Sequence, residues 1–244
     1  MERLELYWID PQQPADHFPD LRYALEEPNG LLAFGGDLST ERLIAAYERG
    51  IFPWYSKDEP ILWWSPDPRS VIFPEDFKPS RSLKKTIKKR HFEVTMDTSF
   101  TQVIQKCSEP RSYSSDTWIT EEMIEAYIRL HNLKIAHSVE VWKEKELVGG
   151  LYGVSLGKAF FGESMFSSVN DASKVALTYL IEQVKQWNFK LIDCQVSSDH
   201  MSSLGALDIS RSEFMGLLSN MCSGKTRLSD WSIQPDLTDI ILGN

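Results

Sequence analysis

The fold is decided by the stretch HSVEVWKEKELVGGLYGVSLGKAFFGESMF, residues 137–166. It contains three strand-like runs, which the turn-like tetrapeptides KEKE and SLGK separate. Connections this short join neighbouring strands that run in opposite directions. The stretch therefore predicts an antiparallel meander of strands over residues 137–142, 147–154 and 159–166.

Helix and strand patterns continue on both sides of this meander. Upstream, residues 92–97 have a strand pattern and residues 98–109 a helical one. Thr120 precedes a second helix over residues 121–133, which carries acidic residues in its first turn. The meander is therefore expected to have helices before it in the chain.

Downstream, a longer helix opens at Asp171 or Ser173 and leads into the strand-like run FKLIDCQV, residues 189–196. Its apolar residues recur at the spacing 0, 3, 4 and 7, which gives a helix one buried face. These residues are Leu177, Leu180, Ile181 and Val184. The order β-β-β-α-β predicts an α+β fold.

The N-terminal part of the chain has a different texture, because residues 28–79 are rich in Pro, Gly and Trp. Ser39 can cap a helix there whose buried side includes Leu43 and Tyr47. Four prolines over residues 60–74 forbid a long regular element. This part is expected to form a compact, aromatic and turn-rich unit.

Composition describes a globular protein of 244 residues that is 42% hydrophobic. No run approaches the roughly 20 apolar residues that span a bilayer, and the N-terminus lacks the basic and apolar regions of a secretory signal. The cysteines Cys107, Cys194 and Cys222 are too scattered for a disulfide framework or a four-ligand zinc site. We therefore expect a cytoplasmic protein without membrane contact.

Charge is distributed unevenly, although the net charge is −9. Residues 78–92, KPSRSLKKTIKKRHF, hold seven Lys or Arg and no acid. In a helix, Arg81, Lys84, Lys85 and Lys88 would form one basic stripe, opposite an apolar one. Such a stripe suits a phosphate backbone, but a solvated helix face is an equal reading.

A polar pair interrupts the apolar run LIDCQVSSDH, residues 191–200. Because side chains alternate across a strand, Asp193 and Gln195 should share one face. Burying these two polar groups without hydrogen-bond partners would cost on the order of several kcal/mol. The pair therefore either bonds to its neighbours or faces a cleft. We favour a cleft.

The same run holds Cys194, Asp199 and His200, which could suggest a thiol hydrolase or a metal site. Cys194 lies on the strand face opposite Asp193, however. This grouping is therefore disfavoured, and no metal is expected.

The strand order resembles that of acetyl-CoA-dependent (GNAT-like) acyltransferases, which hold the CoA pyrophosphate on a glycine-rich loop before a helix. Here that place reads MFSSVNDASKVA, residues 165–176, without a glycine. We predict a small turn-rich N-terminal α/β domain, residues 1–79, and a larger GNAT-like domain, residues 80–244. The larger domain should have a mainly antiparallel sheet flanked by helices and carry the basic helix 80–91.

Long sequence blocks resemble the leucyl/phenylalanyl-tRNA–protein transferase family. They are NGLLAFGGDLSTERLIAAYERGIFPWYSKDEPILWWSPDPR, DTWIT, AHSVEVWKEKELVGGLYGV, FGESMF and LIDCQVSSDHMSSLGA, and they cover most of residues 28–210. The resemblance implies transfer of Leu or Phe, and less readily Met, from aminoacyl-tRNA to proteins with N-terminal Arg or Lys. The product would be marked for N-end rule degradation.

No cofactor is expected, because aminoacyl-tRNA is an activated substrate. A monomer is expected, because the sequence shows no oligomer signal. Two alternatives stay open: a CoA-dependent N-acetyltransferase, favoured by topology, and a non-catalytic RNA-binding or adaptor protein, favoured by the basic stripe. Protection by acetyl-CoA, or tRNA binding without product, would distinguish them.

Three groups of site residues are expected: the resemblance implies the catalytic and aminoacyl-binding groups, and the basic stripe gives the tRNA-binding group. Asp193 and Gln195 would be catalytic, with Asp193 acting on the attacking amine through Gln195. Since an ordinary Asp has a pKa of about 3.9, electrostatic anchoring of the amine is an alternative to proton abstraction. The aminoacyl-binding residues would be Trp54, Trp118, Leu151, Glu163, Leu180 and Ile192. The tRNA-binding residues would be Arg81, Lys84, Lys85, Lys88 and Lys89.

Overall fold

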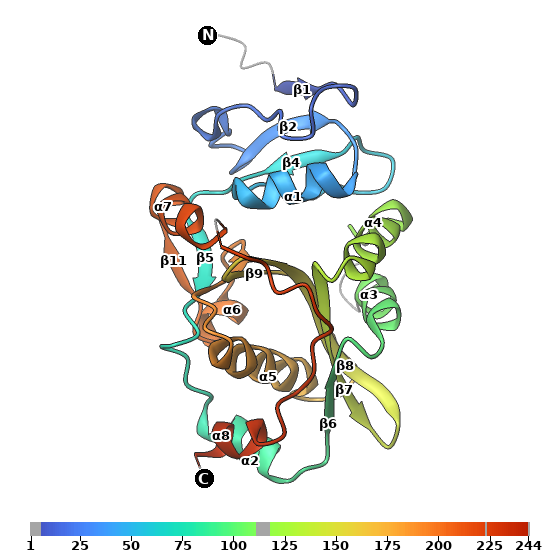
Figure 1. The fold of residues 1–244 in the computed structure, drawn as a ribbon, viewed down its shortest axis with the longest axis vertical. Coiled ribbons are helices and arrows are strands. Elements are labelled where there is room, and N and C mark those ends of the chain that lie inside the picture. Colours follow the sequence, from blue (N-terminus) through green and yellow to red (C-terminus); the bar gives the residue numbers. More distant parts are fainter. Residues whose placement is uncertain (1–5, 111–117, 223, 244) are drawn as a thin grey trace.

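A computed structural model of the chain describes residues 6–110, 118–222 and 224–243. Residues 1–5 of the expected N-terminal domain, residues 116 and 117 of the DTWIT block, and residues 223 and 244 lie outside the described residues. The described residues form two sheets, one of four strands and one of seven (Figure 1). The expected α+β class is confirmed.

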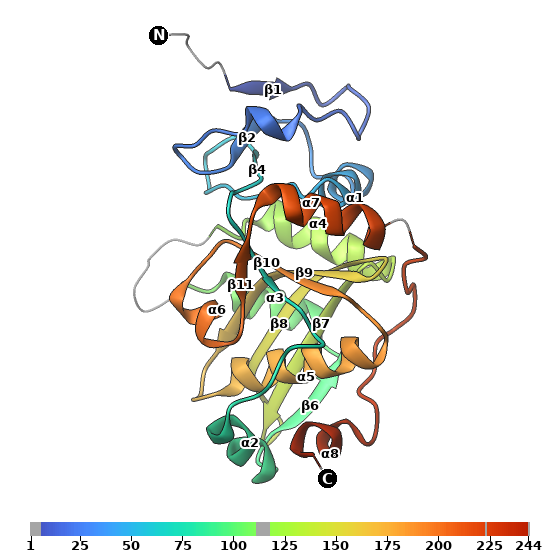
Figure 2. The same ribbon diagram turned by 90° about the vertical axis from the view of Figure 1, so that its left-hand side faces the viewer.

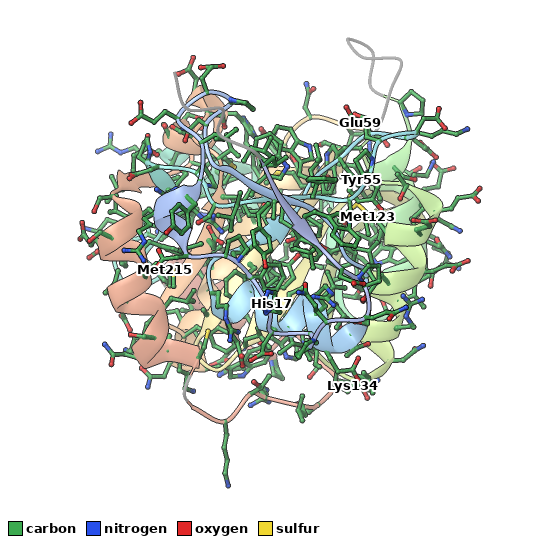
Figure 3. The ribbon with its side chains drawn as sticks, turned by 90° about the horizontal axis from the view of Figure 1, so that it is seen from above. His17, Tyr55, Glu59, Met123, Lys134 and Met215 are labelled. Carbon is green, nitrogen blue, oxygen red and sulfur yellow. The ribbon has the colours of Figure 1, made fainter. Side chains whose placement is uncertain are left out.

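The smaller sheet has the strand order β1-β2-β4-β3 and belongs to the N-terminal part. Its strands are β1 (Tyr7–Ile9), β2 (Leu31–Gly35), β3 (Phe52–Pro53) and β4 (Leu62–Trp64). A 3₁₀ turn, η1 (Leu21–Tyr23), and helix α1 (Thr40–Glu48) accompany it. Seen from above, this part lies between α7, which carries Met215, and α4, which carries Met123 (Figure 3).

The larger sheet has the order β11-β5-β10-β9-β8-β7-β6. Its strands are β5 (Arg69–Ile72), β6 (Glu93–Met96), β7 (Ala136–Lys143), β8 (Glu146–Leu156), β9 (Ala159–Ser167), β10 (Leu191–Gln195) and β11 (Leu207–Ile209). The three expected meander strands pair antiparallel as β7, β8 and β9. β10 pairs parallel with β9, because α5 carries the chain back across the sheet.

The remaining helices cover both faces of this sheet. They are α2 (Arg81–Lys88), α3 (Phe100–Ser108), α4 (Glu121–Asn132), α5 (Ala172–Gln186), α6 (Asp199–Ser203), α7 (Arg211–Cys222) and α8 (Leu237–Leu242). α3 and α4 pack on the face opposite α5 (Figures 1 and 2). Alternation along β8 divides the core accordingly, since Leu151 packs in the cluster with α5 and Tyr152 in the other cluster.

Local signals set the helix starts as expected. The side chain of Ser39 accepts a hydrogen bond from the Arg42 amide of α1, and that of Thr120 accepts one from the Met123 amide of α4. Ser80 caps α2 in the same way. At α5 the N-cap is Asp171, one of the two residues the sequence allowed. Gly149 lets the start of α5 approach β8, because a Cβ there would lie 2.5 Å from the Ala172 side chain.

The chain passes from the smaller to the larger sheet before the expected domain boundary at residue 79. β5 lies within the expected N-terminal domain, yet it pairs with β10 and β11 in the larger sheet. All four residues of β5 are buried, so the strand belongs to the larger core. The change of sheet therefore falls between Trp64 and Arg69, and the division into two domains stays a prediction.

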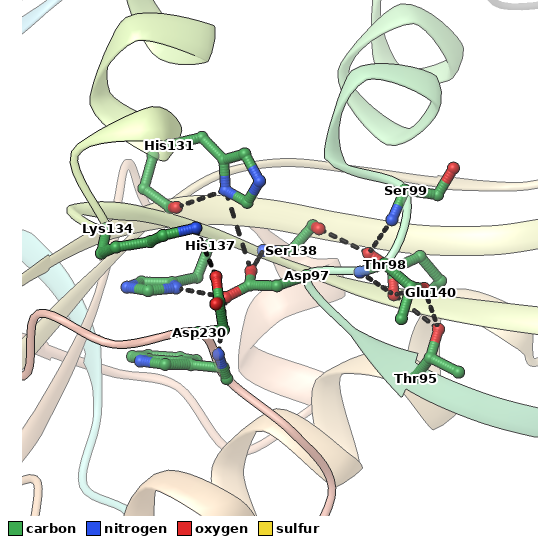
Figure 4. Close-up of polar contacts among 12 residues, drawn as sticks. Thr95, Asp97, Thr98, Ser99, His131, Lys134, His137, Ser138, Glu140 and Asp230 are labelled. Carbon is green, nitrogen blue, oxygen red and sulfur yellow. Dashed lines mark hydrogen bonds and ion pairs between the residues drawn. The ribbon is translucent and has the colours of Figure 1, made fainter.

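A C-terminal strap, residues 224–236, runs along the molecule from α7 to α8 (Figures 1 and 2). Trp231 fastens the strap, because its ring stacks on His137 at a centroid distance of 3.9 Å. Its backbone amide donates to Asp97, whose same carboxylate oxygen lies 2.7 Å from Nδ1 of His137. Figure 4 shows Asp97 held among His137, Ser138 and His131. No helix in the described part of the chain is long and apolar enough to cross a bilayer.

We expect the substitution Trp231→Ala to destabilise the fold by about 3 kcal/mol or more, because it removes a large buried ring. Trp231 is 2% exposed, whereas Leu228 on the same strap is 62% exposed. The matched control Leu228→Ala should change the free energy of unfolding by about 0.5 kcal/mol or less. Urea denaturation at equilibrium measures both, and equal effects would contradict the role of Trp231.

Candidate active site

An apolar cavity of about 240 Å³ opens between β8, β9, β10 and α5. It contains five of the six expected aminoacyl-binding residues: Trp118, Leu151, Glu163, Leu180 and Ile192. Phe160, Leu177 and Met201 complete its apolar wall. The structure thus gathers side chains from distant segments around one space, which we call the apolar cavity.

Trp54 is the expected residue that the apolar cavity does not include. It lines a second cavity of about 400 Å³, together with Phe52 and Gln195. Trp118, Glu163 and Cys194 line both spaces, so the two cavities adjoin. Trp54 is 41% exposed, which places it at the outer side of this second space, which we call the outer cavity.

The cavities meet where β9 and β10 separate. Their paired residues run from Leu191 with Ala159 to Asp193 with Phe161. The next residues of both strands, Gly162 with Glu163 and Cys194, line the apolar cavity. A site between two diverging strands exposes backbone and side chains of both to a substrate.

Glu163 is the buried carboxylate at the junction. Its Oε1 accepts hydrogen bonds from the Tyr47 hydroxyl at 2.7 Å and from Nε2 of Gln195 at 2.8 Å. Its Oε2 accepts one from the Tyr127 hydroxyl at 2.7 Å. Burial raises the pKa of Glu163 to about 7, although these hydrogen bonds oppose the shift. Glu163 can therefore exchange a proton near neutral pH.

Asp193 lies behind this junction and lines neither cavity. It is fully buried, and Arg69 of β5 donates to both of its carboxylate oxygens, from Nε at 2.8 Å and from Nη2 at 2.6 Å. The Arg69 guanidinium also donates to the Gly50 carbonyl and lies over the rings of Phe52 and Phe214. Asp193 is thus held by a planar ion pair and is away from a substrate.

Gln195 breaks the strand alternation on which the expected common face of Asp193 and Gln195 rested. The pairing of β10 with β5 shifts register between the two residues, and Gln195 has a φ of +65°. Its backbone amide donates to Oδ1 of Asp193 at 2.8 Å, while its side chain turns to Glu163. The expectation of a regular strand was wrong here because this bulge redirects the amide. Both readings of the pair hold in part: Asp193 bonds to neighbours and Gln195 faces a cavity.

Cys194 and His200 both line the apolar cavity, but the chemistry of a thiol nucleophile is disfavoured. Burial raises the pKa of the Cys194 thiol strongly, with Asp193 as a further cause, so the reactive thiolate is suppressed. Among the described residues no group of three His, Cys, Asp or Glu side chains could hold a metal ion.

Sequence patterns did not identify three residues of the candidate site: Arg69, Tyr47 and Tyr127. The spacing of both tyrosines predicts core positions, and both are fully buried. A hydroxyl at a core position needs a partner, which is the signal that could have identified them. Arg69 opens a fully buried strand, where a charge also requires a partner.

The five expected tRNA-binding residues lie on and just after α2. Leu83 and Ile87 are buried as expected, and the opposite side carries the basic stripe. In this stripe Arg81, Lys85, Lys88 and Lys89 are exposed and Lys84 is half-buried. The helix ends at Lys88, shorter than the expected range 80–91. α2 packs against α5 and α8 at the end of the molecule opposite the smaller sheet (Figures 1 and 2).

Comparison with known proteins supports one family. The model of the leucyl/phenylalanyl-tRNA protein transferase family matches residues 71–219, and the model of its N-terminal domain matches residues 36–67. A leucyl/phenylalanyl-tRNA–protein transferase of Cellvibrio japonicus is 58% identical over 86% of this chain and 89% of that protein. One of Nitrosomonas eutropha is 56% identical over 88% and 92%.

Among solved structures, L-PGS from Bacillus licheniformis overlaps with a TM-score of 0.39 and 10% identity, over 86% of this chain and 63% of that one. A likeness at this level carries no inference about the chain. The sequence matches and the two adjoining cavities together define an aminoacyltransferase. The chain belongs to the leucyl/phenylalanyl-tRNA–protein transferase family, as the sequence blocks predicted.

Removal of one partner of the buried ion pair should be costly. We expect Arg69→Leu to destabilise the fold by roughly 3 to 5 kcal/mol, because it leaves the Asp193 carboxylate buried without its counter-charge. The double variant Arg69→Leu with Asp193→Leu should regain much of this loss. Urea denaturation of the two single variants and the double variant measures the coupling, and additive effects would contradict it.

Proposed function

We propose that this chain transfers Leu or Phe, and less readily Met, from aminoacyl-tRNA to the α-amine of proteins that begin with Arg or Lys. Such transfer would mark the product for N-end rule degradation. The observation that carries the proposal is the apolar cavity that ends at Glu163, which Gln195 of the adjoining outer cavity contacts, in a chain of this family. An aminoacyl ester is already activated, so the proposed reaction uses no cofactor.

The apolar cavity is the proposed place of the donor side chain. Its walls are aliphatic and aromatic, and its volume of about 240 Å³ is modest. Apolar walls discriminate by about 1 to 3 kcal/mol per methylene, which agrees with acceptance of Leu, Phe and Met together. The ester carbonyl would then lie at the junction beside Glu163.

The outer cavity is the proposed place of the acceptor N-terminus. Gln195 and Glu163 line it, so an α-amine there would meet the ester at the junction. Asp193 fixes the Gln195 backbone through a hydrogen bond and is proposed to position Gln195. It therefore serves the reaction through Gln195, which would itself contact the amine.

The divergence of β9 and β10 supports a GNAT-like arrangement, in which donor and acceptor meet between two parallel strands. The N-terminus of α5, however, is unsuited to a CoA pyrophosphate. Asp171 puts a negative charge beside this terminus, and the amides of Ala172 and Ser173 already donate within the chain, to the Val169 carbonyl and to Oγ of Ser167. This observation disfavours the CoA-dependent alternative, and the two cavities disfavour a purely RNA-binding role.

Monomeric action in the cytoplasm is part of the proposal. Cys107, Cys194 and Cys222 form no disulfide in the described part of the chain, which agrees with a reducing compartment. The proposal keeps two domains, with the basic helix α2 in the larger one; the two family models meet between residues 67 and 71, earlier than the predicted boundary at residue 79.

The proposal predicts label transfer from [³H]leucyl-tRNA to a peptide that begins with Arg, and little transfer to an otherwise identical peptide that begins with Gly. Labelled acetyl-CoA, offered as a second donor, should give no product. Chromatography of the peptides measures the outcome. Transfer from acetyl-CoA alone would establish the rival activity, and tRNA retention without product would establish a binding protein.

The basic stripe of α2 is the proposed docking surface for the tRNA acceptor stem. Phosphate contacts supply affinity without sequence information, and A-form RNA is recognised largely by shape. The exposed cations of this short helix lie on one side, as this requires.

Charge reversal of Lys84 and Lys85 to Glu should weaken tRNA binding by on the order of tenfold or more at moderate salt and reduce the slope of log K against log salt by about 2. The matched control reverses Lys143 and Lys145, which are exposed at the end of β7 and in the turn to β8 and give the same change of net charge. Filter binding across a salt series measures both. Equal losses in the two variants would reject α2 as the docking surface.

A further inference from the structure

Tyr47, Tyr127 and Glu163 form a closed hydrogen-bonded ring at the junction of the cavities. Tyr47 comes from α1, Tyr127 from α4 and Glu163 from β9. Each tyrosine hydroxyl contacts one carboxylate oxygen of Glu163 at 2.7 Å, and the two hydroxyls also contact each other. Both tyrosines are fully buried, and Glu163 keeps 9% of its surface exposed, where it lines the cavities.

The number of protons in the ring determines which of its contacts are hydrogen bonds. It contains three oxygen–oxygen contacts, and the two hydroxyls supply only two protons. If Glu163 is ionised, one contact has no proton. If Glu163 carries a proton, all three contacts are hydrogen bonds. The ring therefore accommodates both states of Glu163 and has a bonded place for one additional proton.

The other ionisable groups around Glu163 do not offer the same exchange. Asp193 on β10 is occupied by Arg69 and faces away from the cavities. Burial raises the pKa of Tyr152 on β8 well above its ordinary value, and that of Cys194 on β10 is raised strongly. His200 lines the apolar cavity from α6, where it is exposed.

On the function proposed above, we infer that Glu163, held by Tyr47 and Tyr127, is the base that takes the proton from the attacking α-amine. Glu163 lines both cavities, which is the position that an amine in one and an ester in the other require. Gln195 donates its amide hydrogen to Glu163, so its carbonyl oxygen is left to accept from the amine. Gln195 thereby orients the amine toward Glu163.

The acceptor binds after its ammonium loses one proton to solvent, and the neutral nitrogen forms a bond to the ester carbonyl carbon. The nitrogen gives its second proton to the Glu163 carboxylate. The carbon–oxygen bond to the ribose then breaks, and the departing ribose oxygen takes the proton from Glu163. The products are the new amide and a tRNA with a free hydroxyl, and Glu163 is ionised again.

The electrostatics of the site agree with this role. A general base works best when its pKa lies near the working pH, and burial raises the pKa of Glu163 to about 7. The ionised base becomes more abundant as pH rises, so kcat should increase through about pH 7. The hydrogen bonds from Tyr47 and Tyr127 lower this pKa against the effect of burial, so removing one should move the increase to higher pH.

The test measures kcat and KM for leucyl-tRNA transfer to an Arg peptide between pH 5.5 and 9. We expect Glu163→Gln to lower kcat by about 10²- to 10⁴-fold, with little change in KM for leucyl-tRNA, and to abolish the rise through about pH 7. The acceptor amine, with a pKa of about 8, should still titrate in the variant and provides an internal reference. A variant that keeps kcat within about tenfold with an unchanged pH profile, or loses activity only through KM, would overturn the inference.

Tyr127→Phe is the second variant, because it keeps Glu163 and removes one donor. Its pH profile should shift upward by about one pH unit. Tyr179→Phe is the matched control, since that hydroxyl bonds Thr238, remote from the ring, and its loss should leave the profile unchanged. An unshifted Tyr127→Phe profile would overturn the role of the ring. Absence of transfer by the wild-type chain would instead overturn the proposed function, and the inference with it.

Discussion

The ion pair between Arg69 and Asp193 is the interaction on which the rest of the site depends. Arg69 is 1% exposed and Asp193 fully buried, and a guanidinium that donates to both carboxylate oxygens fixes their common plane. The same guanidinium donates to Gly50, at the end of α1, and lies against Phe52 and Phe214. Buried pairs contribute little net stability compared with apolar substitutes, so the value of this one lies in geometry. It joins the N-terminal part, α7 and the larger sheet at one point.

That geometry explains why two carboxylates one strand apart behave differently. Asp193 has a full counter-charge and accepts a third hydrogen bond from the Gln195 amide, which holds the bulge and its positive φ. Glu163 has only neutral donors, two hydroxyls and one amide, and its burial without a counter-charge raises its pKa to about 7. Separate environments for neighbouring carboxylates are the usual way in which one site obtains distinct acid and base roles.

Sequence patterns predicted features that depend on neighbouring residues, but not those that depend on tertiary contacts. Ser39 and Thr120 cap helices because capping acts within four residues, and the meander follows from its short turns. The bulge at Gln195 depends on the pairing of β10 with β5, which is far away in the chain. Strand alternation alone therefore predicted the wrong direction for the Gln195 side chain. The family resemblance identified most residues that line the apolar cavity. The ring of Tyr47, Tyr127 and Glu163 could not be predicted, because it joins α1 and α4 to β9 and only the fold brings these elements together. The strap had no motif at all.

The start of α5 shows how the fold can serve a donor other than CoA. A phosphate-binding loop would leave free amides there, but the amides of Ala172 and Ser173 donate to the Val169 carbonyl and to Oγ of Ser167. The carboxylate of Asp171, just before the helix, accepts a hydrogen bond from Thr86 of α2 at 3.2 Å, and α2 packs on α5. Asp171 therefore fastens the basic helix beside the start of α5. On the proposed function, the phosphate-binding role passes from a helix terminus, which suits one pyrophosphate, to a helix side, which suits a series of backbone phosphates.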